Sequence, residues 1–296
     1  LIYLSYFIFF KKIEFSKSII SIEKNQSIIT IIDKNLFNYS TYDRNLFKLI
    51  SILNSKYIKK IHYGRFIIDN NINLYKFLKT ITQPSNYLNK ITIIEGSSKD
   101  ELNKILTNKF LITKNIEYED IIAETYFLHS YQDFDEFIDK LIKFKKDFEI
   151  KYKNHILLKS FNFNELLIIG SLLEKEGIDN NDKKLIFSEI KKRLKNKMRL
   201  QIDATVIFSL TDGKFKLGRK LHYNDLKVNH PYNTYKIYGL PPGPISYVGR
   251  KTIELIFENY NSEYLFYFYN NETNKHIYSK TYQDHKKKLN EYRNKK

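Results

Sequence analysis

Apolar and polar residues in the first hundred positions follow the order strand, turn, helix. The apolar run IISI, Ile19–Ile22, predicts a short strand, and Ser27 is placed to cap a helix that begins with IITIID. Further helices are expected over TYDRNLFKLISIL and over NLYKFLKTI, which ends before Pro84, with a strand over KKIHYGRFII between them. A second strand and helix occupy residues 91–106, where Ser98 and Glu101 match a capping box. These elements predict a small α+β module.

The middle of the chain changes to long helices. Phe137, Leu141 and Phe144 form one apolar stripe in a predicted helix over residues 134–155. Residues 166–173 are apolar almost all round, so a buried helix is expected over residues 165–176, with Asn164 as N-cap and Gly177 just past its end.

A second helix follows this buried helix, with apolar residues inward and a basic face that is expected to meet solvent. Its outward residues are expected to be Lys191, Lys192, Arg193, Lys195 and Lys197.

Two carboxylates close the buried helix. Glu174 and Glu176 are two residues apart, which places them roughly 200° from each other around the helix axis, so they do not form a facing pair. Glu176 groups with Ile169, Leu172 and Leu173, and burial together with the negative end of the helix dipole would raise its pKa. A raised pKa suits a general acid. The alternative is that both glutamates form a solvated helix end.

Polar and aromatic residues then gather in two segments. In RLQIDATVIF, Gln201, Asp203 and Thr205 alternate with apolar residues, which predicts an extended segment with its polar groups on one side. Tyr232 and Tyr235 in YNTY offer surfaces for stacking on sugar rings, next to a loop containing Pro241, Pro242 and Pro244. The alternative for this loop is a polyproline connector.

Composition limits the classes of partner. A formal net charge of +17 favours anionic partners, although Lys, Asn, Ile, Tyr and Phe are all frequent, as a general compositional bias would make them. No arginine-rich tract or RNA-reading signature is present. The chain has no cysteine, and its seven histidines show no paired ligand spacing, so we expect no metal and no cofactor.

The first ten residues, LIYLSYFIFF, are apolar and are followed by Lys11 and Lys12. They are too few to span a bilayer, which takes roughly 20 residues in a helix. Two interpretations stay open: part of a membrane anchor or signal segment, or a first core strand.

The succession LLEKEG, MRLQIDATVIF, PYNTYKIYGLPPGPI and HIYSKTYQDH resembles the endolytic murein transglycosylases of the MltG (YceG-like) family over roughly residues 166–286. The segment IIAETY is also similar, with Ala123 where the family usually has Pro. Tyr247 and Val248 replace a common Asn-Pro pair, and Ala204 and Lys197 also depart from the family pattern.

The resemblance implies that Glu176 is the catalytic residue. The residues that it implies for substrate binding are Gln201, Asp203, Thr205, Tyr232, Asn233, Thr234, Tyr235 and Glu124. It also implies an α+β fold, with an N-terminal membrane anchor remnant (1–12), a LysM-like module (18–110) and a YceG-like catalytic domain (111–296).

The expected function is lytic cleavage of the MurNAc–GlcNAc bond within peptidoglycan strands, leaving 1,6-anhydro-MurNAc ends. The expected location is the inner (plasma) membrane, single-pass, with the catalytic domain on the periplasmic or outer side and cell-wall synthases as partners. A non-catalytic peptidoglycan-binding protein is the main alternative. A nucleic-acid binder, whose affinity would fall steeply with salt, is the other, and we expect no nucleic acid as partner.

Overall fold

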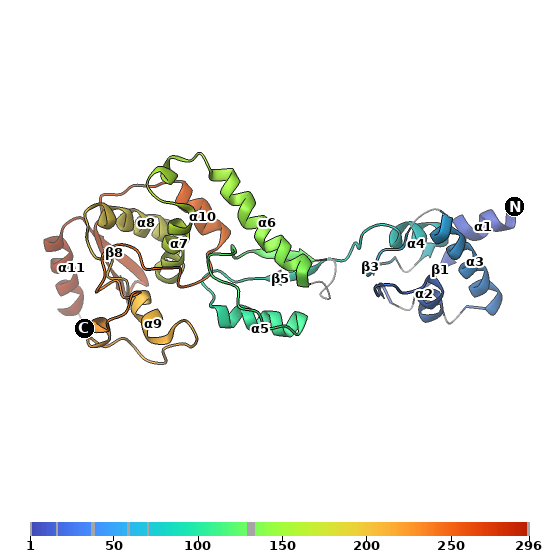
Figure 1. Cartoon of the computed structure of the whole chain (residues 1–296), viewed down its shortest axis with the longest axis horizontal. Helices are drawn as coiled ribbons and strands as arrows, with labels where there is room; N and C mark the ends of the chain where they lie inside the picture. Colours follow the sequence, from blue (N-terminus) through green and yellow to red (C-terminus); the bar gives the residue numbers. More distant parts are fainter. Residues whose placement is uncertain are drawn as a thin grey trace. The chain divides into compact units, whose positions relative to one another are not determined.

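A computed structural model describes residues 2–15, 17–36, 39–57, 60–69, 71–128 and 134–294. The chain divides into two compact units. Unit 1 comprises Leu1–Ile91 with Phe127–Phe134, and unit 2 comprises Thr92–Tyr126 with Asp135–Lys296. Helices and short strands occur in both units, and the described strands form four two-stranded sheets, which confirms the α+β class (Figure 1).

Unit 1 is built from short elements around an apolar core. The elements are α1 (Ile2–Phe9), β1 (Lys12–Ile13), β2 (Ile19–Ile22), α2 (Ile28–Asn35), α3 (Thr41–Tyr57), β3 (Gly64–Ile67), β4 (Ile72–Asn73) and α4 (Leu74–Ile81). β2 pairs antiparallel with β3, and β1 pairs antiparallel with β4. The core includes Phe47, Phe66 and Phe77, all at most 1% exposed. The strand at β2 and the Ser27 cap of α2 confirm the sequence prediction.

The first residues form a helix, so the interpretation as a core strand is wrong. Phe7 of α1 is 1% exposed and stacks on Phe47, while Tyr3, Tyr6 and Phe9 are exposed. Across the parts of the chain that the structure describes, no helix is both long enough and apolar enough to cross a bilayer.

Unit 2 contains most of the helices that the structure describes. Strands β5 (Asn89–Thr92) and β6 (Thr125–Leu128) pair where the chain passes between the units. The other elements are α5 (Lys99–Phe110), α6 (Phe134–Tyr152), η1 (Ile156–Lys159), α7 (Phe163–Glu176), α8 (Asn180–Lys195), α9 (Asp203–Thr211), η2 (Asp225–Lys227), α10 (Arg250–Phe257), β7 (Phe266–Asn270), β8 (Lys275–Ser279) and α11 (Tyr282–Asn294). The Ser98–Glu101 capping box at the start of α5 is present as predicted.

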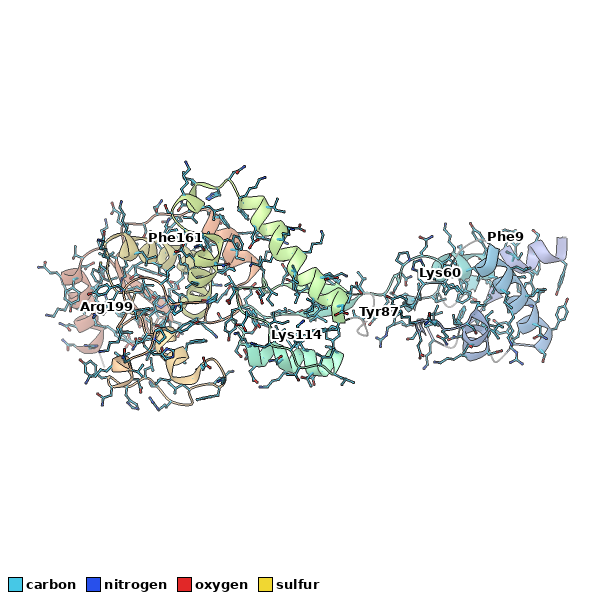
Figure 2. The ribbon with its side chains drawn as sticks, viewed as in Figure 1. Phe9, Lys60, Tyr87, Lys114, Phe161 and Arg199 are labelled. Atoms are coloured by element: carbon cyan, nitrogen blue, oxygen red, sulfur yellow. The ribbon has the colours of Figure 1, made fainter. Side chains whose placement is uncertain are left out.

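Helix α7 is the centre of unit 2. It packs against α8, α9 and α10, and every residue from Leu166 to Leu173 is buried (Figure 1). This explains why the sequence is apolar all round rather than on one face. Figure 2 shows side chains crowded along this part of the chain, which carries the labels Phe161 and Arg199.

The start of α7 differs from the prediction by two residues. Asn162, not Asn164, is the N-cap, and its side chain accepts a hydrogen bond from the main-chain N–H of Glu165 at 2.9 Å. Glu165 returns the bond by accepting from the Asn162 N–H at 2.7 Å. The reciprocal pair is a capping box, which satisfies two otherwise unpaired N–H groups.

The segment 245–249 runs close along α7. The Ile245 N–H donates to Ser171 Oγ at 3.0 Å, and the Ser246 hydroxyl donates to the Ser171 carbonyl at 3.3 Å. A Cβ on Gly170 would lie 2.6 Å from Val248 Cγ1, closer than van der Waals contact allows. Glycine at position 170 therefore permits this close approach.

Two other sequence predictions in unit 2 are wrong. Residues from Asp203 onward form the helix α9, not an extended segment, so the alternation of Gln201, Asp203 and Thr205 does not place them on one side. Arg193 does not face solvent: its side chain is 8% exposed, contacts Glu189 Oε1 at 2.5 Å, and donates to the Leu200 carbonyl at 2.7 Å.

Candidate active site

Glu176 is the last residue of α7, and a tight turn follows it. A Cβ on Gly177 would lie 2.3 Å from Lys183 Cγ, so only glycine allows α8 to approach the end of α7 this closely. The φ of Gly177 is −75°, which any residue can adopt. The predicted glycine stop is therefore present, and close packing is its physical reason.

The Glu176 carboxyl is half-buried and lies between two donors. The main-chain N–H of Ala204, in the first turn of α9, is 3.4 Å from Oε1, and the hydroxyl of Tyr267, in β7, is 3.3 Å from Oε2. Burial is the largest influence and raises the pKa of Glu176, although the two donors and His276 act in the opposite direction. The predicted direction of this pKa shift is confirmed.

Glu174 has different surroundings. Its side chain is 3% exposed and pairs with Lys183 Nζ at 2.6 Å, while its Oε1 accepts from the Gly249 N–H at 2.9 Å. Lys183 also donates to Thr252 Oγ1 at 2.9 Å. Glu174 thus ties α7 to α8 and α10. The interpretation of both glutamates as a solvated helix end is wrong, because each carboxyl is hydrogen-bonded to groups on other elements.

The start of α9 brings Asp203 near Glu176 and places Gln201 just before the helix. Asp203 is exposed, and its Oδ1 accepts from the Tyr235 hydroxyl at 2.6 Å. The charge of Asp203 also contributes to the raised pKa of Glu176. Gln201 is exposed and has a φ of 54°, a left-handed conformation that turns the chain just before α9.

Three other predicted residues are buried and bonded to the protein. Thr205 and Thr234 are each 0% exposed, with their hydroxyl oxygens 2.8 Å apart. The side chain of Asn233, also 0% exposed, donates to the Val228 carbonyl at 2.7 Å and accepts from the Tyr235 N–H at 3.0 Å. These side chains fix the loop to α9.

Tyr232 and Glu124 make their contacts with other residues. The Tyr232 ring packs on Phe208 at a centroid distance of 4.6 Å. Glu124 accepts from the N–H of Thr125 at 2.8 Å and lies 3.9 Å from the Arg250 guanidinium. Among the described residues, neither side chain forms a hydrogen bond or an ion pair with Glu176.

A cavity of about 530 Å³ is lined by Lys175, the residue before Glu176, and by Ala204, whose N–H lies 3.4 Å from the Glu176 carboxyl, whereas Glu176 itself does not line it. One face of α9, with Ile207 and Phe208, and the side chain of Phe215 give it an apolar wall. A partly buried carboxyl next to a cavity with aromatic walls is suited to acid–base chemistry on a sugar. In the described residues, no three His, Asp or Glu side chains gather as metal ligands would.

Sequence reasoning missed Tyr267 as a partner of Glu176. The only available signal was the alternation of FYFYN in a predicted strand, and this does not tell which tyrosine reaches a site 91 residues earlier in the chain.

A model of the YceG-like family matches residues 20–291, which is most of the chain. The chain belongs to the YceG-like family. An endolytic murein transglycosylase of Bacillus subtilis is 34% identical over 158 residues, which are 53% of this chain and 42% of that protein. One of Streptococcus pneumoniae D39 is 29% identical over 181 residues, 60% of this chain and 32% of that protein. This YceG-like chain spans less than half the length of these relatives.

A crystal structure of a yceG-like protein from Listeria monocytogenes is similar in fold, with a TM-score of 0.57 at 24% identity. The match covers 91% of this chain and 98% of that chain. The YceG-like fold therefore extends over both compact units.

Proposed function

We propose that this protein is an endolytic lytic transglycosylase that cleaves the MurNAc–GlcNAc bond within peptidoglycan strands and leaves 1,6-anhydro-MurNAc ends. The observation that carries the proposal is the Glu176 carboxyl, half-buried between the Ala204 N–H and the Tyr267 hydroxyl at the end of the buried helix α7. The relatives named endolytic murein transglycosylases support it.

The chemistry requires one group that acts first as acid and then as base. Glu176, whose pKa is raised by burial, first protonates the glycosidic oxygen as the bond to C1 breaks. The resulting carboxylate then accepts the proton of the muramic acid 6-hydroxyl while that oxygen attacks C1 and closes the 1,6-anhydro ring. No water is consumed, so the second carboxylate of a usual glycosidase is not needed.

The other predicted site residues have two kinds of role in this proposal. Gln201, Asp203 and Tyr235 contact the sugar and its acetamido group, and of these Asp203 and Tyr235 lie close enough to Glu176 to interact with it electrostatically. Thr205, Asn233 and Thr234 act indirectly, because their buried hydrogen bonds hold this loop in place. Substrate binding by Tyr232 and Glu124 is a proposal that rests on the family resemblance alone.

The cellular setting follows from the proposed substrate. We infer an envelope location, because peptidoglycan lies there. Attachment through residues 1–12, a LysM-like character of residues 18–110, and partnership with cell-wall synthases are further proposals that rest on the family resemblance alone. The relatives' names support catalysis and give no support to the non-catalytic wall-binding alternative.

The test is Glu176→Gln on purified glycan strands, with the ends identified by mass spectrometry. Loss of the proposed acid–base group is expected to reduce release of anhydro ends by about 10²- to 10⁴-fold. Glu165→Gln is the matched control on the same helix, because glutamine can still complete the capping box with Asn162.

Three outcomes would contradict parts of the proposal. Release of anhydro ends by Glu176→Gln at the wild-type rate would show that Glu176 is not the catalytic residue. Reducing ends in place of anhydro ends would make the protein a hydrolase. Binding to wall sacculi without cleavage by the wild-type protein would favour the non-catalytic alternative.

A further inference from the structure

The β7–β8 hairpin presents a face of polar aromatic residues. β7 and β8 are antiparallel, with Tyr267 opposite Tyr278 and Tyr269 opposite His276. Because directly opposed residues of a sheet point to the same side, these four rings share one face. The other face, which includes Phe266 and Phe268, packs on α11 through Tyr282 and His285.

Asp182 in the first turn of α8 holds this polar face. Its Oδ2 lies 2.8 Å from His276 Nδ1 and accepts from the Ile178 N–H at 3.0 Å, while its Oδ1 accepts from the Tyr278 hydroxyl at 2.6 Å. Burial opposes ionisation of Asp182, but the hydrogen bonds from His276 and Tyr278 outweigh it, and its pKa lies below the usual value. The anion therefore fixes the hairpin against the start of α8.

Tyr267 connects the hairpin to Glu176. Its ring packs edge-on against His276 at 4.9 Å, and its hydroxyl donates to Glu176 Oε2 at 3.3 Å. Burial raises the pKa of Tyr267 well above its usual value, so the hydroxyl keeps its proton at every working pH.

The two partners of Glu176 are chemically different. The Ala204 N–H at Oε1 can only donate, so Oε1 has to remain an acceptor in both protonation states. A hydroxyl both donates and accepts, so Tyr267 can reverse its role when Oε2 gains a proton. The arrangement therefore distinguishes the two oxygens of a single carboxyl.

We propose that Tyr267 is a positioning residue for Glu176, which fixes the carboxyl and makes Oε2 the oxygen that carries the transferred proton. The inference rests on the proposed function for its kinetic consequence, but the positioning itself can be measured without substrate. Asp182 supports Tyr267 by holding the hairpin.

Several other groups act electrically on Glu176 and must stay unchanged in a test of Tyr267. Those on neighbouring elements are Asp203 at the start of α9, Tyr235 of the following loop, Glu189 of α8 and His276 of β8, while Arg193 of α8 acts on Tyr267 itself. A variant that removes only the Tyr267 hydroxyl leaves all of them in place.

The test is Tyr267→Phe with Tyr269→Phe as matched control. Tyr269 is on the same strand and the same face, but its hydroxyl donates to Asn274 in the turn, at 3.0 Å. We expect Tyr267→Phe to lower kcat about 10-fold with KM nearly unchanged, because the hydroxyl orients the acid and does not bind substrate. Tyr269→Phe is expected to match the wild-type protein.

The pKa of Glu176 gives a readout that a merely structural role would not move. A donor to a carboxylate favours its charged form, so loss of the Tyr267 hydroxyl raises the pKa of Glu176, and the alkaline limb of kcat moves to higher pH. The carboxyl signal, assigned with Glu176→Gln in ¹³C-glutamate-labelled protein, reports this pKa by NMR without substrate.

A second substitution, expected to shift the pKa of Glu176 in the opposite direction, keeps the proposal testable if Tyr267→Phe fails to fold. Site-specific 3-fluorotyrosine at position 267 keeps the ring and makes the hydroxyl a stronger donor, so the pKa of Glu176 is expected to fall. Unchanged Glu176 titration in both variants would overturn the positioning role. If the pKa of Glu176 shifts as predicted but the protein cleaves no glycan strand, the positioning role of Tyr267 is supported and the proposed function is refuted.

Discussion

At the scale of single residues, Glu174 and Glu176 show how two positions decide the role of a carboxyl. Glu174 turns towards Lys183 and Gly249 and forms a buried ion pair. Glu176 turns towards α9 and β7, where its partners are two long hydrogen bonds and no cation lies within pairing distance in the described residues. The first arrangement stabilises an anion in the interior, and the second leaves the carboxyl free to exchange a proton.

This contrast predicts opposite effects on stability. Glu174→Gln leaves the Lys183 ammonium, whose side chain is 12% exposed, without its anion, and is expected to reduce the free energy of unfolding by about 3 kcal/mol. Glu176→Gln removes a carboxyl whose charge burial disfavours, so its stability at pH 7 is expected to equal or exceed that of the wild-type protein.

Chemical denaturation of both variants at pH 7 measures this difference. A loss of stability in Glu176→Gln as large as that in Glu174→Gln would show that Glu176 also holds the fold. The buried ion pair of Glu174 therefore makes Glu174→Gln the more costly of the two changes for folding.

At the scale of elements, the ends of α7 are set by local chemistry at one end and by packing at the other. The N-terminus is a capping box between Asn162 and Glu165, which requires no tertiary contact. Both Asn162 and Asn164 are suitable cap residues, and only Asn162 has a glutamate three residues later. This three-residue spacing is the feature of the sequence that identifies Asn162, and not Asn164, as the N-cap.

Alanine substitutions separate the two asparagines. Asn162→Ala is expected to lower the free energy of unfolding by about 1 kcal/mol, because the N–H of Glu165 loses its acceptor. Asn164→Ala lies at an exposed position inside the first turn and is expected to have an effect within about 0.5 kcal/mol of zero. Equal losses in urea denaturation would contradict the assignment of Asn162 as the cap.

The start of α9 illustrates an element that local pattern cannot determine. Gln201, Asp203 and Thr205 alternate with apolar residues over only five positions, which is compatible with a strand or with a helix start. In the structure, Gln201 has a left-handed backbone and the Ile202 N–H donates to Thr234 Oγ1 at 2.9 Å. This contact with a loop 32 residues later places the helix start at Asp203.

At the scale of the whole molecule, the two compact units have separate cores. The core of unit 1 lies between Phe7 and Ile81, whereas all the proposed site residues, from Glu124 to Tyr235, belong to unit 2. Units with their own cores are expected to unfold as separate cooperative transitions.

Phe66→Ala and Phe187→Ala test this separation. Both side chains are 0% exposed, Phe66 in unit 1 and Phe187 in unit 2, and each truncation is expected to cost about 3–5 kcal/mol. In calorimetry, each variant should lower the midpoint of a different transition. Below its lowered transition, Phe66→Ala should cleave glycan strands at the wild-type rate. A single transition, shifted by both variants, would show that the units fold together.

The sequence by itself determined the helix that carries the acid, its stop before Gly177, and the apolar side from which Glu176 projects. It did so because helical periodicity, caps and breakers act over a few residues. The resemblance of several ordered motifs also indicated the YceG-like family, which the comparison confirms.

Only the tertiary structure decided which groups surround Glu176. Tyr267 and the Ala204 N–H reach it from 91 and 28 residues away, and Asp182 joins His276 across 94 residues. Such partners are selected by how α8, α9 and the β7–β8 hairpin pack around α7, and packing of distant elements leaves no periodic trace in the local sequence. The same reason explains why the sequence placed Arg193 in solvent, whereas it lies buried against Glu189.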